Sequence, residues 1–255
     1  MYTASLAVFT ATSALYPQAQ ALAKQLNLPF SLIPSTEYDY FMILTPEYLG
    51  LKSNHTDYLP LYVDFLSAQN QYRLKSTSLR KEALIRALGL KAGANYSIID
   101  ATAGLARDSF ILASFGFKVQ LLERSPIIIA LVQDGMKRAL VHPEIAPIIN
   151  NMKIIETDAR DYLANLMPPA YPDLIYLDPM FPPKSKAALS KKEMQLFQAI
   201  LPSIDEENSE LLTTALACAK HRVVVKRPKQ ADNLGNIAPH FSLKGSSCRF
   251  DIYLT

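Results

Sequence analysis

Residues 96–178 alternate between short apolar runs and segments with helical spacing, which restricts the folds open to this chain. The apolar runs predict strands, and the spacing between them predicts helices. The predicted strands are residues 96–100, 117–122, 152–156 and 174–178, and the helices between them are residues 107–115, 126–140 and 159–166. Such alternation predicts an α/β fold, a doubly wound parallel sheet covered by helices on both faces.

The pattern changes towards the C-terminus. One helix is predicted before the first strand, at residues 79–88. After the fourth strand, helices are predicted at residues 192–201 and 209–219, and a fifth strand at residues 222–226. After these, residues 241–244 and 249–254 predict two short strands joined by a Gly-Ser-Ser turn, with no helix between them. A doubly wound sheet that ends in such an antiparallel hairpin is a feature associated with methyltransferases.

The first 75 residues lack this alternation. They predict a small N-terminal α+β domain over residues 1–75, followed by a larger domain over residues 76–255. Strands are predicted at residues 5–10, 40–45, 48–51 and 61–65, with one helix at residues 17–26. Residues 69–81 are polar and basic with little acid, which is typical of a solvated linker and equally suits contacts with phosphates.

Charge and composition narrow the class of protein. A formal net charge of +3 is mildly basic and compatible with a nucleic-acid partner. The two cysteines and four histidines show no ligand spacing, so no metal is expected. No run approaches the roughly 20 apolar residues of a membrane span, and the N-terminus lacks the positive region of a signal peptide. We therefore expect a monomeric cytoplasmic protein with reduced thiols.

Small residues fill the turn after the first strand of the predicted sheet, between Asp100 and Gly104. In an open α/β sheet ligands bind at the carboxyl ends of the strands, and small residues let the backbone approach a cofactor. We expect Asp100 and Gly104 to border that cofactor. A single glycine does not make the pyrophosphate turn of a dinucleotide site, so S-adenosylmethionine is favoured over NAD.

Charged residues near the strand ends are further candidates for cofactor binding. Arg107 stands at a helix start, where a cation is unfavourable, so we expect it to hold the cofactor's carboxylate. Asp108 equally suits a helix start. Glu123 ends the second strand and is placed to accept hydrogen bonds from ribose hydroxyls. Asp158 either receives the adenine amino group or only caps the next helix.

The fourth apolar run ends in Asp178, and a proline-rich loop with one aromatic residue follows at once. A carboxylate and a backbone carbonyl near Pro179 are able to hold the hydrogens of a planar amino group while the ring of Phe181 stacks on a flipped base. Holding those hydrogens favours the tetrahedral nitrogen of a methyl-transfer transition state. The sequence thus predicts catalysis by position and electrostatics, without a strong general base.

Basic residues on both sides of this site predict contacts with RNA phosphates. They are Arg73, Lys75 and Arg80 before the sheet, and Lys184, Lys186, Lys226 and Arg227 around its later strands. A solvated surface is the alternative interpretation of the same residues.

Several longer motifs resemble those of the bacterial small-subunit ribosomal RNA guanine-N2 methyltransferase family. They are Asp-Ala-Thr-Ala-Gly-Leu-x-Arg-Asp at residues 100–108, Leu-Glu-Arg at 122–124, Tyr-Leu-Asp-Pro-Met-Phe-Pro at 176–182, Lys-Lys-Glu-Met at 191–194, Val-Val-Val-Lys-Arg-Pro at 223–228 and Arg-Phe-Asp-Ile-Tyr at 249–253. The resemblance covers most of the chain from about residue 40 onwards.

This resemblance implies a class I methyltransferase fold, S-adenosylmethionine as methyl donor, and one guanine of the small-subunit ribosomal RNA as acceptor. By motif match it assigns cofactor contacts to Arg107, Asp108, Glu123, Arg124, Asp158, Ala159 and Asp178. One departure is Ala106, where family members often carry a second glycine.

Two other functions stay open. The same arrangement of a carboxylate and a backbone carbonyl around a planar amino group also suits a methyltransferase that acts on adenine in DNA, on another RNA or on a protein amide. A non-enzymatic RNA-binding protein of the same fold is the second alternative, but such a relative should have lost Asp178 or Glu123, and both are present.

Overall fold

The computed structural model describes residues 4–76, 78–179, 196, 205–245 and 248–255. These residues fall into two compact units. The smaller unit contains residues 4–64 and 125–141, and the larger contains residues 65–124, 142–179 and 205–255. The predicted division of the chain at residue 75 stays a prediction.

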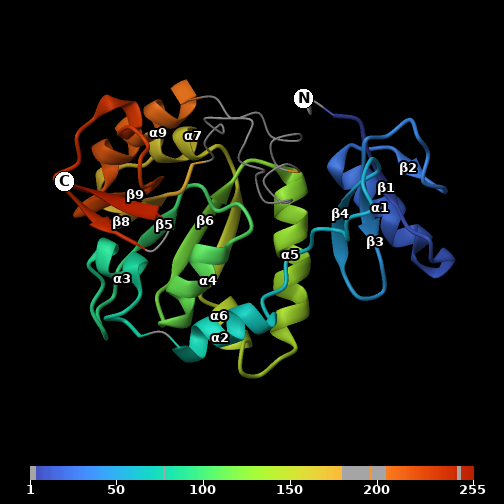
Figure 1. The fold of residues 1–255 in the computed structure, drawn as a ribbon, viewed down its shortest axis with the longest axis horizontal. Coiled ribbons are helices and arrows are strands. Elements are labelled where there is room, and N and C mark those ends of the chain that lie inside the picture. Colours follow the sequence, from blue (N-terminus) through green and yellow to red (C-terminus); the bar gives the residue numbers. More distant parts are fainter. Residues whose placement is uncertain (1–3, 77, 180–195, 197–204, 246–247) are drawn as a thin grey trace. The chain divides into compact units, whose positions relative to one another are not determined.

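A seven-stranded sheet forms the centre of the larger unit, in the order β10-β11-β9-β8-β5-β6-β7 (Figure 1). Its strands are β5 (Ile98–Asp100), β6 (Val119–Glu123), β7 (Met152–Glu156), β8 (Leu174–Leu177), β9 (Arg222–Pro228), β10 (Phe241–Lys244) and β11 (Cys248–Leu254). The five strands from β5 to β9 pair in parallel, whereas β11 runs antiparallel to both β9 and β10. The predicted fold class, a doubly wound sheet ending in an antiparallel hairpin, is confirmed.

Helices cover both faces of this sheet. The helices of the larger unit are α2 (Ala68–Ser76), α3 (Ala83–Leu88), α4 (Arg107–Ser114), α6 (Ala146–Ile149), α7 (Ala159–Ala164) and α9 (Asp205–Cys218), with the 3-10 turns η2 (Pro168–Ala170) and η3 (Leu234–Asn236). One face buries Ile175, Leu177 and Val225 against Leu212 of α9. Because side chains alternate along a strand, Tyr176 and Val224 point to the opposite face, where α3 packs on β9 to β11 and α4 on β6 and β7.

The smaller unit has a four-stranded sheet in the order β2-β1-β3-β4. Its elements are β1 (Leu6–Phe9), η1 (Ser13–Leu15), α1 (Tyr16–Leu26), β2 (Phe30–Ser31), β3 (Tyr40–Leu44), β4 (Leu49–Ser53) and α5 (Pro126–Leu140). Helix α5 contacts β4. It begins where the sequence predicts, because the Ser125 side chain accepts a hydrogen bond from the Ile128 amide and proline occupies the first turn.

The predicted strand at residues 61–65 is wrong. Only Leu61 pairs with a strand, through a bridge to Leu51. The next part of the segment packs against α5 instead: a methyl group added at Gly135 would lie 2.7 Å from the Val63 side chain, and the Val63 carbonyl accepts a hydrogen bond from Arg138. A short apolar run is therefore predicted to be a strand even where the segment packs against a helix.

Two further predictions need correction or fall outside the described residues. Residues 69–81, for which a solvated linker was one of two interpretations, begin within helix α2 (Ala68–Ser76). The short strand β2 was not predicted, since two residues carry no periodic signal. The predicted helix at residues 192–201 lies outside the described part, apart from Leu196.

Among the described residues, no helix has both the length and the apolar composition to cross a bilayer. In the same part of the chain, no three His, Cys, Asp or Glu side chains gather as metal ligands.

Candidate functional site

Four charged residues meet at one edge of the large sheet because parallel strands end side by side. Asp100 ends β5, Glu123 ends β6, Asp178 follows β8, and Lys226 lies near the end of β9. Strand β5 is hydrogen-bonded to both β6 and β8, so chain order reverses there. In open α/β sheets this reversal is where ligands bind.

Lys226 bridges Asp178 and a further carboxylate, that of Asp108 in the first turn of α4. Its Nζ atom lies 2.8 Å from Asp108 Oδ2 and 2.7 Å from Asp178 Oδ2. The Tyr176 hydroxyl donates to the same oxygen of Asp108 at 2.7 Å, and the Asp178 amide donates to Thr102 Oγ1 at 2.6 Å. The Asp178 backbone and side chain are thus held from two directions, while 37% of the side chain stays exposed.

Burial and neighbouring charges shift the titration of this cluster. Burial raises the pKa of Asp178 to about 6, against the opposing effect of Lys226. Burial also acts to raise the pKa of Asp108, but the Lys226 ammonium outweighs it, with help from the Tyr176 hydroxyl, and that pKa lies below its usual value. Burial disfavours the charge on Lys226, yet the two carboxylates hold its pKa above the ordinary value. The bridge is therefore an ion pair at neutral pH.

Asp100 supports the turn from inside the protein. Only 2% of it is exposed, and its oxygens accept hydrogen bonds from Ser109 Oγ at 2.6 Å and from the Thr102 amide at 3.2 Å. Burial raises the pKa of Asp100 to about 7. Its predicted contact with the cofactor stays a prediction, but in this structure its partners are the residues that shape the turn.

The turn itself is built from backbone conformations that side chains rarely adopt. Gly104 has φ of +50° and donates its amide to Glu123 Oε2 at 3.1 Å. Ala106, buried at the start of α4, has φ of 60° and ψ of 24°. A non-glycine residue in this region costs about 1–2 kcal/mol. Hydrogen bonds from Ala106 N to Ala103 O and from Phe110 N to Ala106 O hold it there.

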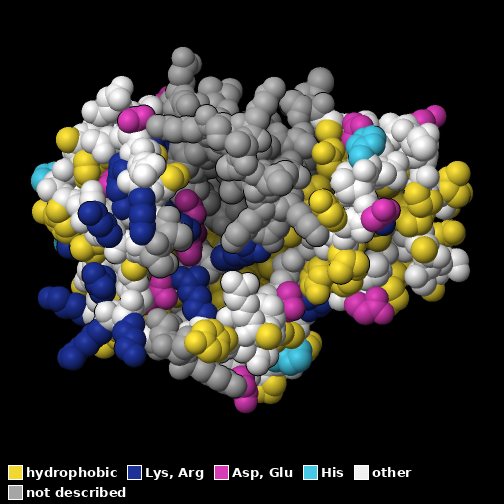
Figure 2. Space-filling model, viewed as in Figure 1, with side chains coloured by type: hydrophobic (Ala, Val, Ile, Leu, Met, Phe, Trp, Pro, Cys, Tyr) yellow, Lys and Arg dark blue, Asp and Glu magenta, His cyan; other side chains and the backbone are white. Residues whose placement is uncertain are grey.

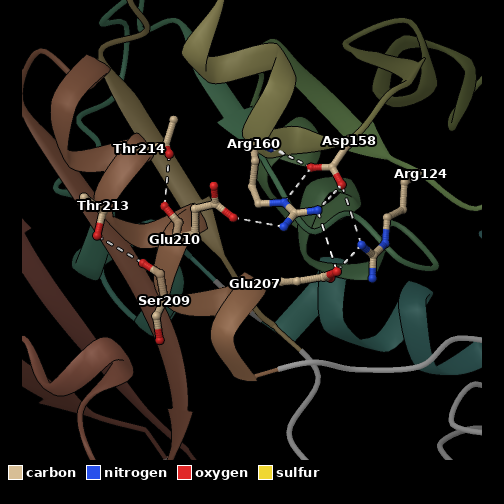
Figure 3. A network of polar contacts seen from close by, with 8 residues as sticks. All are labelled: Arg124, Asp158, Arg160, Glu207, Ser209, Glu210, Thr213 and Thr214. Atoms are coloured by element: carbon tan, nitrogen blue, oxygen red, sulfur yellow. Dashed lines mark hydrogen bonds and ion pairs between the residues drawn. The ribbon is translucent and has the colours of Figure 1, made fainter.

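Arg124 and Asp158 belong to a second charged network at this edge (Figure 3). Asp158 caps α7 by accepting from the Arg160 amide, and it also accepts from the Arg160 guanidinium at 2.8 Å. Arg124 reaches Glu207 of α9 at 2.7 Å and Asp158 at 3.6 Å, while Arg160 also binds Glu210 at 3.0 Å. The contacts with Arg160 hold the pKa of Asp158 at about 2.

Of the two interpretations of Asp158, the structure shows the helix cap. Its role towards adenine stays a prediction, and so does that of Ala159, the buried first residue of α7. Arg107 is exposed at the start of α4, next to Asp108. Pro179 is buried.

The residues predicted to contact RNA are spread over different environments. Arg73 binds Glu82 at 2.8 Å and lies 3.9 Å from Asp108, and Arg80 is exposed. Arg227 is only 7% exposed and donates to the carbonyl of Asp232, which counts against a phosphate contact. Phe181, Lys184, Lys186 and the side chain of Lys75 lie outside the described part of the chain.

Sequence reasoning missed the roles of Thr102, Tyr176 and the Lys226 bridge. Two signals were available. A lysine directly after Val-Val-Val in a buried strand needs a charged partner, and the Tyr176 ring lies on the same face as Asp178 because the two residues are two positions apart.

Comparison with known proteins identifies the family. A family model described as "Putative SAM-dependent methyltransferase" matches residues 21–255, where SAM is S-adenosylmethionine. This chain belongs to that methyltransferase family. Its methyl donor is S-adenosylmethionine, and the predicted cofactor is confirmed.

Relatives match this methyltransferase over nearly its whole length. Two proteins named Ribosomal RNA small subunit methyltransferase J are 46% identical in Aeromonas salmonicida, over 93% of this chain and 92% of the relative, and 44% identical in Thioalkalivibrio sulfidiphilus, over 96% of each. The crystal structure of a SAM-dependent methyltransferase from Neisseria gonorrhoeae is 31% identical, with a TM-score of 0.74, and covers 97% of this chain and 95% of that one.

The residues at the sheet edge of this methyltransferase fit S-adenosylmethionine. A Cβ atom built at Gly104 would meet nothing closer than the Thr102 carbonyl at 3.9 Å, so the turn leaves open space beside the glycine. The Glu123 carboxylate lies against the same glycine. Open space next to small residues and a strand-end carboxylate is the arrangement that a nucleoside requires.

The buried Asp100 gives a prediction about stability. The Asp100 carboxyl group ionises near pH 4 in the unfolded chain and near pH 7 in the folded protein. The stability that protonated Asp100 contributes is therefore complete below pH 4 and is lost as pH rises to about 7. Asp100→Asn removes this dependence while its amide keeps partners in Thr102 and Ser109. We expect urea unfolding to show the variant gaining on wild type by up to about 1.4 kcal/mol per pH unit across that range, and levelling off above it. A difference that does not change with pH would contradict the prediction.

Proposed function

We propose that this methyltransferase transfers a methyl group from S-adenosylmethionine to the exocyclic N2 atom of one guanine in small-subunit ribosomal RNA. The names of its relatives support the RNA. The observation that carries the choice of an amino acceptor is the placement of Asp178. Its carboxylate is partly exposed just after β8, is fixed by Lys226 and Thr102, and lies beside the turn at Gly104.

The cofactor side of the site uses Glu123 and Arg107. Glu123 accepts hydrogen bonds from the ribose hydroxyls, and Arg107, exposed at the start of α4, binds the carboxylate of the amino-acid part. The bound cofactor supplies an electrophilic methyl group on a positively charged sulfur. Asp108 and Asp178 would contribute negative charge to the site that holds this group, and Lys226 neutralises that charge only in part.

Asp178 acts on the acceptor nitrogen. The lone pair of an aromatic amine is delocalised into the ring, and hydrogen bonds from its two N–H groups to the ionised carboxylate and to a backbone carbonyl near Pro179 localise that pair. The nitrogen then forms a bond to the methyl carbon as the carbon–sulfur bond breaks, and one N–H proton leaves afterwards to solvent. Lys226 keeps Asp178 ionised for this role.

The proposal also covers the location, the oligomeric state and the domains of the protein. The protein acts as a cytoplasmic monomer on ribosomal RNA or on an assembling small subunit, without a metal. Residues 1–75 form an accessory domain, and residues 76–255 carry the cofactor and the acceptor site.

Mapping methylated nucleotides by mass spectrometry tests the substrate. Small-subunit ribosomal RNA from cells without the gene should lack one N2-methylguanine, which purified protein and S-adenosylmethionine restore. A missing methyl group on adenine, or on a protein, would overturn the assignment.

Asp178→Ala should lower the rate of methyl transfer by roughly 100- to 1,000-fold, the loss typical of removing one electrostatic contact to a transition state. Cofactor affinity should fall much less, because the hydrogen bonds at stake are those of the amine. Turnover and calorimetric affinity measured on one preparation separate the two effects. Near-wild-type turnover would remove Asp178 from the reaction.

Glu123→Ala should weaken S-adenosylmethionine binding by roughly tenfold to a hundredfold, since a hydrogen bond to a charged group contributes about 1.5–3 kcal/mol. Glu123→Gln is the matched control because it keeps an acceptor for the Gly104 amide. Calorimetry should place the glutamine variant between alanine and wild type. Unchanged affinity in both variants would show that the ribose binds elsewhere.

Lys226→Met should move the acid limb of the pH–rate profile. In wild type, activity should fall as pH drops through about 6, the pKa of Asp178. Without the ammonium, burial and the charge of Asp108 act unopposed, so the pKa of Asp178 rises and activity at pH 7 drops but recovers at higher pH. A profile with the wild-type midpoint would show that Lys226 does not control this carboxylate.

A further inference from the structure

Positive charge is concentrated in two segments of the larger unit. Residues 68–91 contain six Lys or Arg and one acid, and residues 220–255 contain seven Lys or Arg and two acids, although the whole chain carries only +3. Of the three acids, Glu82 binds Arg73, and Asp251 is buried against Arg249. Asp232 is exposed. Lys and Arg thus outnumber Asp and Glu in both segments, and both carry a net positive charge.

The two segments lie together in the fold. Helix α3 packs on β9, β10 and β11, and Arg222 donates to the Ala87 carbonyl at the end of α3 at 2.9 Å. Figure 2 shows Lys and Arg side chains gathering over the part of this face where Figure 1 labels α3, β8 and β9. The two segments therefore contribute Lys and Arg side chains to the same face.

Strand register places part of this surface at the edge that holds Asp178. Lys229 follows the end of β9, and Cys248 of β11 pairs with Pro228. Lys244 ends β10 opposite Arg249. Both lysines are exposed. Because β8 and β9 pair in parallel up to Leu177 and Val225, the end of β9 that Lys229 follows and the end of β8 that Asp178 follows lie at the same edge of the sheet.

A second pair of cations reaches the same edge from the other segment. Arg80 and Lys81 are exposed and directly precede Glu82. The Glu82 carboxylate binds Arg73, whose guanidinium lies 3.9 Å from Asp108. The start of α3 thus lies beside the Lys226 bridge, and its end lies beside Arg222 at the opposite edge of the sheet.

We propose that Arg80, Lys81, Lys229 and Lys244 form a track that binds the phosphates flanking the acceptor base. The inference rests on the proposed function and adds the surface by which the RNA is held. Lys and Arg neutralise backbone phosphates without reading sequence, and they fix the register of a bound strand. A phosphate track next to Asp178 holds the target nucleotide within reach while the base is turned into the site.

The test compares two double variants with the same change of charge. Lys229→Glu with Lys244→Glu alters the track. Lys118→Glu with Lys153→Glu is the control, because these two exposed lysines lie at the amino ends of β6 and β7, the opposite edge of the same sheet. Thermal unfolding and calorimetry with S-adenosylmethionine confirm that each variant is folded and binds the cofactor.

Affinity for a small-subunit ribosomal RNA transcript is then measured against salt concentration. The track variant should bind roughly 10- to 100-fold more weakly at 0.1 M salt, and the slope of log affinity against log salt should fall by about 2, one for each lost phosphate contact. The Michaelis constant for RNA should rise while kcat is kept. The control variant should match wild type in all of these quantities.

The possible failures are distinguishable. If both double variants lose affinity and slope equally, the effect belongs to net charge and the track is overturned. If the track variant binds RNA like wild type, or if anionic lipid vesicles compete for the track and RNA does not, the inference is also overturned. If wild-type protein methylates no small-subunit RNA, the proposed function fails. The RNA affinities of the track variant and the control variant would still show whether the track binds RNA.

Discussion

The ion pairs of Lys226 with Asp108 and Asp178 are the interaction on which the site depends. Two carboxylates this close repel one another, and the low polarity of their surroundings makes that repulsion costly. A single ammonium group within 2.8 Å of both makes the arrangement stable. The carboxylate that we assign to the acceptor amine therefore owes both its place and its charge to a residue on the neighbouring strand.

Hydrogen bonds behind the site extend this support into the sheet. Thr102 accepts from the Asp178 amide, Tyr176 donates to Asp108, and Asp100 ties the turn to Ser109. These groups come from α4 and from the ends of β5 and β8, so the turn that borders the cofactor and the Asp178 carboxylate share one set of partners. Small displacements at either place change the other, since buried polar networks lose stability when one member is unsatisfied.

Much of the fold and part of the site follow from the sequence. Helix α5 and strand β7 have the predicted bounds, because a cap with proline and a bounded apolar run are local signals. The meeting of Glu123 and Asp178 at one edge follows from parallel topology alone. The partners of Lys226 do not, since they lie 118 and 48 positions away and depend on side-chain directions in the packed protein. The segment around Val63 was misread for the same reason: its partner is a helix more than 60 positions further along.

That last contact bears on the order in which the chain acquires structure during synthesis. The smaller unit takes α5 from residues 125–141, so residues 4–64 leave the ribosome before the helix that covers Val63 exists. Strands β5 and β6 of the larger unit are made in the interval. The apolar surface of the N-terminal segment therefore stays uncovered until α5 has been synthesised. Partly folded intermediates with such exposed surface are the species that chaperones bind and that aggregate when protein is made too fast.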